Sequence, residues 1–241
     1  MKHKLRRLKK SIATRTLNSR GVSIFFDAHR LLPEWQVNTV FDVGANIGQS
    51  AIEFRKAFPA ATIYCFEPVQ KTFEKLKSNT GNLKQTKNFL IALSASDGEG
   101  RITVNEQSTQ NRITSVMDCS TTEQVKIRAI DSFAAENNID HINYLKVDTE
   151  GNDLNVLLGA TNMLTNQRVD LIEVECGMNK NNTYHNYFIE ILDFLSQKGY
   201  RLFGIYEQKH EWKESKPSLR RANLAFISDR LNSSTKSDNL I

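Results

Sequence analysis

The fold of this chain is decided by the stretch Val40-Phe41-Asp42-Val43-Gly44-Ala45-Asn46-Ile47-Gly48, where an apolar segment ends in an acid and a turn with spaced glycines. A second apolar segment, Thr62–Phe66, ends in Glu67 and Pro68. In an α/β sheet such a turn lets a ligand approach the backbone, and the second acid accepts hydrogen bonds from a ribose diol. The two segments therefore predict a pocket for an adenosine-containing ligand.

The glycine spacing narrows the choice of ligand. Between Gly44 and Gly48 it is G-x-x-x-G, whereas a dinucleotide pyrophosphate calls for G-x-G-x-x-G. S-adenosylmethionine, a cofactor without phosphates, fits this turn better. Asp42 would then organise the turn or bind the amino-acid end of the cofactor, or it would only cap the next helix. Glu67 follows Gly48 at close to the ~20-residue offset of a ribose-binding acid, and the alternative is a solvated carboxylate.

A third strand end offers a further contact. The segment Ala92–Gly98 closes an apolar run and then turns. A group in this segment, with Ser94 as the candidate, could contact the edge of the adenine ring. In the alternative, Asp97-Gly98 is only an ordinary turn signal.

Short apolar runs alternate with stretches of helical periodicity along most of the chain. The predicted strands are Thr39–Val43, Thr62–Phe66, Phe89–Leu93, Tyr144–Val147, Leu171–Glu175, Arg201–Tyr206 and Asn223–Ile227. The predicted helices are Ser50–Phe58, Gln70–Asn79, Asp153–Leu164 and His185–Lys198. This alternation indicates βαβ units around a mainly parallel α/β sheet. The short connection before the last strand favours a reversed final strand.

The predicted domain organisation has three parts. A basic helical extension covers residues 1–30, a single α/β domain covers 31–230, and a flexible tail covers 231–241. The length of 241 residues suits one domain with an extension. Two short strands, Arg101–Val104 and Gln124–Ile130, are predicted as an insertion within 95–130, over the edge of the pocket.

The net charge of +5 is unevenly distributed along the chain. Residues 1–20 contain eight Lys and Arg and no acid, which leaves 24 basic and 27 acidic residues in the remainder. The basic arm could attract anionic lipid or nucleic acid, or it could form a solvated extension. Because the body is acidic and has no evident basic stripe, nucleic acid is not the expected partner. Peripheral contact of residues 1–20 with an anionic membrane stays open, as does the oligomeric state.

Three features predict a cytoplasmic protein, at most peripheral at the inner membrane surface. No apolar run approaches the ~18 residues needed to cross a bilayer. The basic N-terminus is not followed by the apolar segment of a secretory signal. The three cysteines, Cys65, Cys119 and Cys176, form no C-x-x-C pair, which favours a reducing compartment.

Charged residues gather at a predicted strand end in the segment Asn143–Asn152. Strand alternation puts Lys146, Asp148 and Glu150 on one side. Two carboxylates near a reacting hydroxyl could supply a base, a metal ligand or orientation for the substrate. In the structural alternative, Asp148 binds turn N–H groups and Glu150 caps the next helix.

Two more acids, Glu173 and Glu175, share one side of the next predicted strand. Their burial is costly unless they reach the strand end, a partner or a cation. Glu175, at the pocket mouth, is the better catalytic candidate. His185 follows in a polar loop and could act as a base, although a lone loop histidine is more often solvated. No residues have the spacing of zinc ligands, so no metal ligands are predicted, and whether the protein requires a divalent metal stays open.

These segments together resemble the FkbM-type family of S-adenosylmethionine-dependent methyltransferases. The resemblance covers roughly residues 38–205 and rests on Phe41–Gly48, Phe66–Pro68, Ala92–Ser94, Ala129–Phe133, Leu145–Gly151 and Leu158–Ala160. The block Lys-Val-Asp-Thr-Glu-Gly is more specific than the glycine turn, which many class I methyltransferases share.

The resemblance implies a Rossmann-like class I methyltransferase fold, with a seven-stranded, mostly parallel sheet, an antiparallel last strand and helices on both faces. It also implies S-adenosylmethionine as the cofactor and Asp148 beside the methyl donor. The predicted cofactor-binding residues are then Asp42, Gly44, Asn46, Gly48, Glu67, Ser94 and Asp148. The candidates for catalysis are Asp148, Glu150 and Glu175.

One departure from the family pattern concerns the catalytic base. Such proteins often carry an acid followed closely by histidine after the fifth strand, whereas this chain has Glu175-Cys176-Gly177. His185 cannot be assumed to replace that histidine.

The predicted function is O-methylation of a hydroxyl on a sugar, a glycan or a small natural product. One alternative is methylation of RNA, with the basic arm supplying phosphate contacts. The other is a non-catalytic methyltransferase fold used for recruitment. An Asn/Asp-Pro-Pro-Tyr motif for methylating exocyclic base nitrogens is missing, which counts against RNA.

Overall fold

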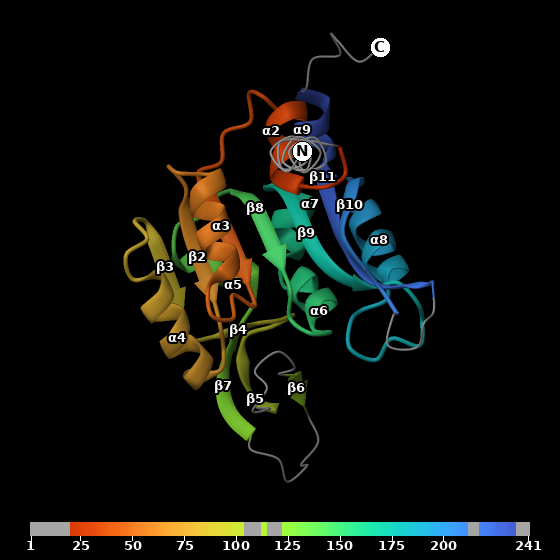
Figure 1. Cartoon of the computed structure of the whole chain (residues 1–241). Coiled ribbons are helices and arrows are strands. Elements are labelled where there is room, and N and C mark those ends of the chain that lie inside the picture. The colour runs from red at the N-terminus through yellow and green to blue at the C-terminus, as the bar shows by residue number, and fades with distance from the viewer. Residues whose placement is uncertain (1–19, 104–111, 115–121, 212–216, 235–241) are drawn as a thin grey trace, which may run out of the picture.

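The computed structural model describes residues 20–103, 112–114, 122–211 and 217–234. Its central sheet has the strand order β10-β11-β9-β8-β1-β2-β3 (Figure 1). The bounds are β1 Thr39–Val43, β2 Thr62–Phe66, β3 Thr86–Phe89, β8 Ile142–Val147, β9 Val169–Gly177, β10 Tyr200–His210 and β11 Leu219–Ser228. The last strand, β11, is antiparallel to both of its neighbours, and the other pairs are parallel. This arrangement confirms the predicted fold class.

Helices cover both faces of the sheet because its strands are buried on both sides. In β1, Val40 packs on one face, while Phe41 and Val43 pack on the other. The Val40 face is covered by α2 Ile24–Leu31, α3 Gln49–Ala57 and α4 Gln70–Thr80. The opposite face is covered by α5 Ile130–Glu136, α6 Asp153–Leu158, α7 Thr161–Thr165 and α8 Phe188–Ser196. Helix α9, Asp229–Ser234, follows β11.

A second sheet, of order β4-β7-β5-β6, lies below the carboxyl ends of the central strands in Figure 1. Its strands are β4 Ala92–Leu93, β5 Gly98–Thr103, β6 Arg112–Thr114 and β7 Thr122–Arg128, and β5 and β7 correspond to the two predicted inserted strands. The prediction of one strand over Phe89–Leu93 is wrong. The chain leaves the central sheet after Phe89, and Ala92 and Leu93 pair with β7 instead. A small separate core, Val69, Ala92, Ile102 and Val125, stabilises the second sheet.

The helix predicted over Asp153–Leu164 is divided into α6 and α7. Two features separate them. Gly159 packs against the backbone of Ser94, where an added Cβ would lie 2.0 Å from the Ser94 carbonyl oxygen. The Asp131 carboxylate then accepts the backbone N–H groups of Asn162 and Met163, at 2.8 and 3.0 Å, and so begins a new helix.

The helix predicted over His185–Lys198 begins only at Phe188. Before it, Tyr187 pairs with Gly177 at the end of β9, and Gly177 donates its N–H to the carbonyl of Asn186 at 2.9 Å. This pairing takes the first residues of the predicted helix into a loop beside the strand ends.

Helix α2 packs on the sheet although it lies within the predicted N-terminal extension. Ile24 and Ala28 are buried in the core, and Asp27 accepts a hydrogen bond from the hydroxyl of Tyr206 at 3.0 Å. Residues 1–19, on which the predicted membrane contact rests, lie outside the described residues, as do Cys119 and residues 235–241. None of the helices in the described ranges is long and apolar enough to cross a membrane.

Replacing Gly159 with Ala should destabilise the protein by about 1–3 kcal/mol, because the added methyl group overlaps backbone that cannot move freely. The matched control is Gly98→Ala, where an added Cβ meets no atom within 4 Å. Urea unfolding of both variants measures the difference. Equal midpoints for the two variants would contradict the close contact between Gly159 and Ser94.

Candidate active site

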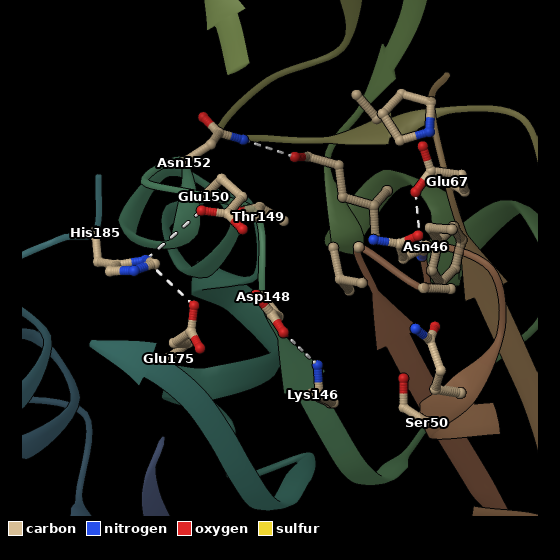
Figure 2. A pocket seen from close by; sticks show the side chains of 18 of the residues that line it. Asn46, Ser50, Glu67, Lys146, Asp148, Thr149, Glu150, Asn152, Glu175 and His185 are labelled. Atoms are coloured by element: carbon tan, nitrogen blue, oxygen red, sulfur yellow. Dashed lines mark hydrogen bonds and ion pairs between the residues drawn. The ribbon is translucent and has the colours of Figure 1, made fainter. Parts of the chain in front are cut away.

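A pocket opens at the carboxyl ends of β1, β2, β8 and β9 (Figure 2). The chain runs from β1 to β2 and β3 on one side, and later from β8 to β9 on the other, so the strand order reverses between β1 and β8. Open α/β sheets bind ligands in the crevice at such a point. The cavity has a volume of about 700 Å³, which is typical of a small-molecule site.

The glycine turn after β1 forms one wall of the pocket. Gly44 and Gly48 have φ angles of 80° and 93°, a region that glycine adopts without strain. The N–H groups of Gly44 and Ala45 both donate to the Phe66 carbonyl at 3.0 Å. On the other side, a Cβ on Gly44 would lie 1.9 Å from the Asp148 carbonyl oxygen. The turn is therefore fixed between β2 and β8, and only glycine permits that approach.

Glu67 extends from the end of β2 toward this turn. One carboxylate oxygen accepts the N–H of Asn46 at 3.1 Å, and the other accepts the N–H of Val69 at 3.0 Å. The residue is only 6% exposed. Burial raises the pKa of Glu67 to about 7, although the two backbone hydrogen bonds oppose the rise. The carboxylate is thus held in one orientation at the pocket wall, with acceptor capacity left on both oxygens.

Asp42 lies beneath the pocket and does not line it. It is fully buried, and within the described residues neither of its carboxylate oxygens has a hydrogen-bond partner. Burial raises the pKa of Asp42 to about 6, against the opposing effects of the Lys146 ammonium and the Ser50 hydroxyl. Lys146 is its register neighbour on β8. Asp42 therefore contributes a charge below the glycine turn, not a direct contact with the cavity.

Two carboxylates that follow β8, those of Asp148 and Glu150, line the cavity. Asp153, and not Asp148, binds the turn: it accepts the N–H groups of Thr149 and Gly151 at 2.8 and 3.1 Å. Asp148 instead pairs with the ammonium of Lys146 at 2.9 Å. Burial favours a higher pKa for Asp148, but Lys146, Arg221 and His185 together outweigh it and the pKa is lowered. The alternative in which Asp148 binds the N–H groups of the turn is therefore not what the structure shows, because Asp153 takes that place.

A cluster of three side chains occupies the side of the pocket opposite Glu67 (Figure 2). Nδ1 of His185 lies 3.3 Å from Oε2 of Glu175 and 4.0 Å from Oε2 of Glu150. The side chains of His185 and Glu175 are only 6% and 7% exposed. Arg221 of β11 pairs with the other oxygen of Glu175. Acidic, basic and imidazole groups thus meet on this side of the cavity. A ligand bound here would face a ligand bound beside Glu67.

Six of the predicted site residues line the pocket: Gly44, Asn46, Glu67, Asp148, Glu150 and Glu175. The other three, Asp42, Gly48 and Ser94, lie behind its wall. Gly48 is the residue before α3 and packs against Thr80 of α4, and the Ser94 hydroxyl lies 3.4 Å from the side-chain oxygen of Asn152.

Sequence reasoning underrated His185 and missed Arg221 and Tyr184, which all line the pocket. A polar loop gives no sign that its histidine is buried against a distant strand. Arg221 meets Glu175 because β11 runs antiparallel to β9, with Arg221 opposite Gly177. Only the strand register reveals that pair.

A family model described as the methyltransferase FkbM domain matches residues 42–202. The chain belongs to the FkbM methyltransferase family. The match includes every predicted site residue, from Asp42 to Glu175, and also His185. The FkbM region thus contains most of the pocket, and Arg220 and Arg221 add to it from β11.

Curated relatives of this FkbM-family chain include two named for methyl transfer. The hexuronic acid methyltransferase AglP of Haloferax volcanii is 29% identical over 157 residues, which cover 63% of each chain. The 2-O-methyltransferase NoeI of Sinorhizobium fredii is 25% identical over 147 residues, which cover 54% of this chain and 60% of NoeI. The chain thus matches about 60% of the length of these relatives.

Among solved structures, an rRNA methylase from Streptococcus thermophilus has a TM-score of 0.50 to the FkbM-family chain, with 10% sequence identity. The alignment covers 87% of this chain and 99% of the methylase. At this identity the similarity concerns the fold alone, and it agrees with the class I methyltransferase architecture.

The buried acid Asp42 predicts a specific pH dependence of stability. Its folded pKa, about 6, lies above the ordinary 3.8, so its protonated form stabilises the fold. That contribution is complete below pH 3.8 and is lost as the pH rises through 6, by up to about 3 kcal/mol. Asp42→Asn should remove this component from the stability profile between pH 4 and 8. Urea unfolding across that range measures it, and parallel profiles for the two proteins would contradict the assignment.

Proposed function

We propose that this chain transfers a methyl group from S-adenosylmethionine to a hydroxyl of a sugar or glycan. The observation that carries the proposal is the division of one cavity into two halves. The glycine turn and Glu67 lie in one half, and Glu150, Glu175 and His185 lie in the other, with Asp148 between them (Figure 2).

The first half suits an adenosyl group. Glu67 would accept hydrogen bonds from the ribose hydroxyls, because its carboxylate is fixed by two backbone N–H groups and still has lone pairs available. Gly44 and Asn46 would border the amino-acid part of the cofactor. The wall at Phe66 and at Ile91–Leu93 is apolar, as the face of an adenine ring requires. When bound, the cofactor supplies a methyl group on a positively charged sulfur.

Asp148 would lie beside that positive charge. Its lowered pKa keeps the carboxylate ionised at neutral pH, and Lys146 limits its movement. A fixed carboxylate next to a sulfonium attracts the cofactor more strongly than the neutral product, which favours release after transfer.

The second half suits a hydroxyl acceptor. As the acceptor oxygen forms its bond to the methyl carbon, its proton has to leave, and Glu175 or His185 could take it. Proper alignment of the reacting oxygen with the methyl group can lower the activation barrier by ~7–11 kcal/mol. Polar and aromatic groups at the mouth, Asn152, Tyr184 and Arg220, offer the hydrogen-bonding and stacking surface that a polyol requires.

The names of the relatives support a sugar acceptor. AglP is named for hexuronic acid, and NoeI is named as a 2-O-methyltransferase. Methylation of RNA has less support, because the similarity to an rRNA methylase concerns the fold alone and because the described pocket is lined by acids as well as by arginines.

Isothermal titration with S-adenosylhomocysteine tests the cofactor half. One saturable site is expected, and Glu67→Ala should weaken binding at least about tenfold, because hydrogen bonds to a charged acceptor contribute roughly 1.5–3 kcal/mol each. Glu67→Gln keeps an acceptor oxygen, so its affinity for S-adenosylhomocysteine should fall less than that of Glu67→Ala. The matched control is Glu74→Ala, a half-exposed acid on α4. Absence of binding by the unaltered chain, or equal affinity in Glu67→Ala, would refute the cofactor assignment.

Transfer of a radioactive methyl group tests the acceptor. Incubation with a glycan mixture rich in uronic acids should label sugar, whereas total RNA should stay unlabelled. Glu175→Gln should lower kcat by about 10²–10⁴ if it assists proton removal, with cofactor affinity unchanged. Label in RNA and none in carbohydrate would overturn the proposed acceptor class.

A further inference from the structure

We propose that Glu150, Glu175 and His185 bind one divalent transition-metal cation in the acceptor half of the pocket. The three residues come from three separate segments: the turn after β8, the end of β9 and the loop before α8. Each offers one ligand atom, and the three atoms lie within 4.8 Å of one another. Their separation along the chain explains why no metal-ligand spacing is visible in the sequence.

The distances within the cluster suit a single cation. Nδ1 of His185 faces both carboxylates, at 3.3 Å from Glu175 and 4.0 Å from Glu150. Two ligand atoms that each bind one metal at about 2.0–2.2 Å lie roughly 3–4 Å apart. The three ligand atoms therefore need to move little to enclose an ion.

The local charge also favours a cation. Two carboxylates approach each other in a partly buried place, and like charges in such a place repel unless a positive charge lies between them. Arg221 pairs with Oε1 of Glu175, which leaves Oε2 directed toward His185. Lys146 is paired with Asp148. Glu150 and Glu175 thus bring two carboxylates to one place beside the imidazole of His185, and a divalent ion would offset the repulsion between them.

The donor set indicates the class of metal. An imidazole combined with carboxylates suits Mn²⁺, Fe²⁺, Co²⁺ or Zn²⁺ better than Mg²⁺ or Ca²⁺, which prefer oxygen ligands alone. Three protein ligands leave coordination positions open toward the cavity. There the ion could bind the acceptor hydroxyl and lower its pKa, so that its proton passes to water while Glu175 and His185 serve as ligands. This role rests on the proposed function, whereas metal binding rests on the cluster alone.

Another histidine cluster in the described part of the chain lacks these properties. His141 lies 2.9 Å from Asp170, but Asp170 also accepts hydrogen bonds from Trp35, Asn143 and Arg230. Its carboxylate is already saturated by donors, and none of these residues lines the active-site cavity. The Glu150–Glu175–His185 cluster is therefore the better candidate.

Direct metal binding tests the inference. Full-length chain without an affinity tag is stripped with EDTA and titrated with MnCl₂, with free Mn²⁺ followed by electron paramagnetic resonance. CoCl₂ titration is followed by visible absorption, which reports the coordination geometry of the bound ion. One saturable site per chain is expected for each ion. His185→Gln and Glu175→Gln should each weaken binding at least tenfold, and His29→Gln, at an exposed position on α2, should leave it unchanged.

Titration of the same variants with S-adenosylhomocysteine separates the two hypotheses. Retained cofactor binding with lost metal binding supports a metal site and shows that the variants are folded. Stoichiometric metal binding by a chain that binds no cofactor supports the site while refuting the proposed function. Absence of a saturable site for both ions, or equal metal affinity in both ligand variants and the wild type, overturns the inference. In that case Glu175 would only orient His185 as a metal-free base.

Discussion

The close approach of Gly44 to Asp148 is the constraint on which the rest of the site depends. An added Cβ on Gly44 would lie 1.9 Å from the Asp148 carbonyl oxygen, and the Asp148 N–H donates to the carbonyl of Val43 at 3.0 Å. The two loops that leave β1 and β8 therefore meet backbone to backbone and diverge above that contact. The crevice between them exists because β1 and β8 are neighbours whose connections run in opposite directions.

Three charged side chains lie in the sheet next to the contact between Gly44 and Asp148. Asp42, Lys146 and Glu173 lie in register on adjacent strands, and Glu173 is satisfied by the hydroxyl of Tyr144 at 2.5 Å and the amide of Asn223 at 2.7 Å. Asp42 has no such partners in the part of the chain that the structure describes. A buried carboxylate whose oxygens lack such hydrogen bonds costs stability. Under the proposed function, this cost falls beside the pocket for a cofactor with a positively charged sulfur, whose binding a negative potential favours.

Much of the fold was predictable because its signals are local. The turn Gly44–Gly48 and the acid Glu67 each follow an apolar strand, and that pattern alone placed them at one edge of the sheet. The division between β3 and β4 was not predictable, since β4 depends on pairing with the distant β7. The burial of His185 depends equally on distant contacts, because Tyr187 in the same loop pairs with Gly177 of β9 and the imidazole faces Glu175. Local patterns thus predicted the pocket wall around Gly44 and Glu67 better than the opposite wall around His185.

The central claim is that the crevice between β1 and β8 holds an adenosyl group with its sulfur directed toward Glu150, Glu175 and His185. A crystal structure with bound S-adenosylhomocysteine tests this claim most directly. The account predicts ribose hydroxyls within hydrogen-bonding distance of Glu67 and an open space between the sulfur and the three-residue cluster. A nucleoside bound outside this crevice, or a sulfur facing away from the cluster, would contradict it.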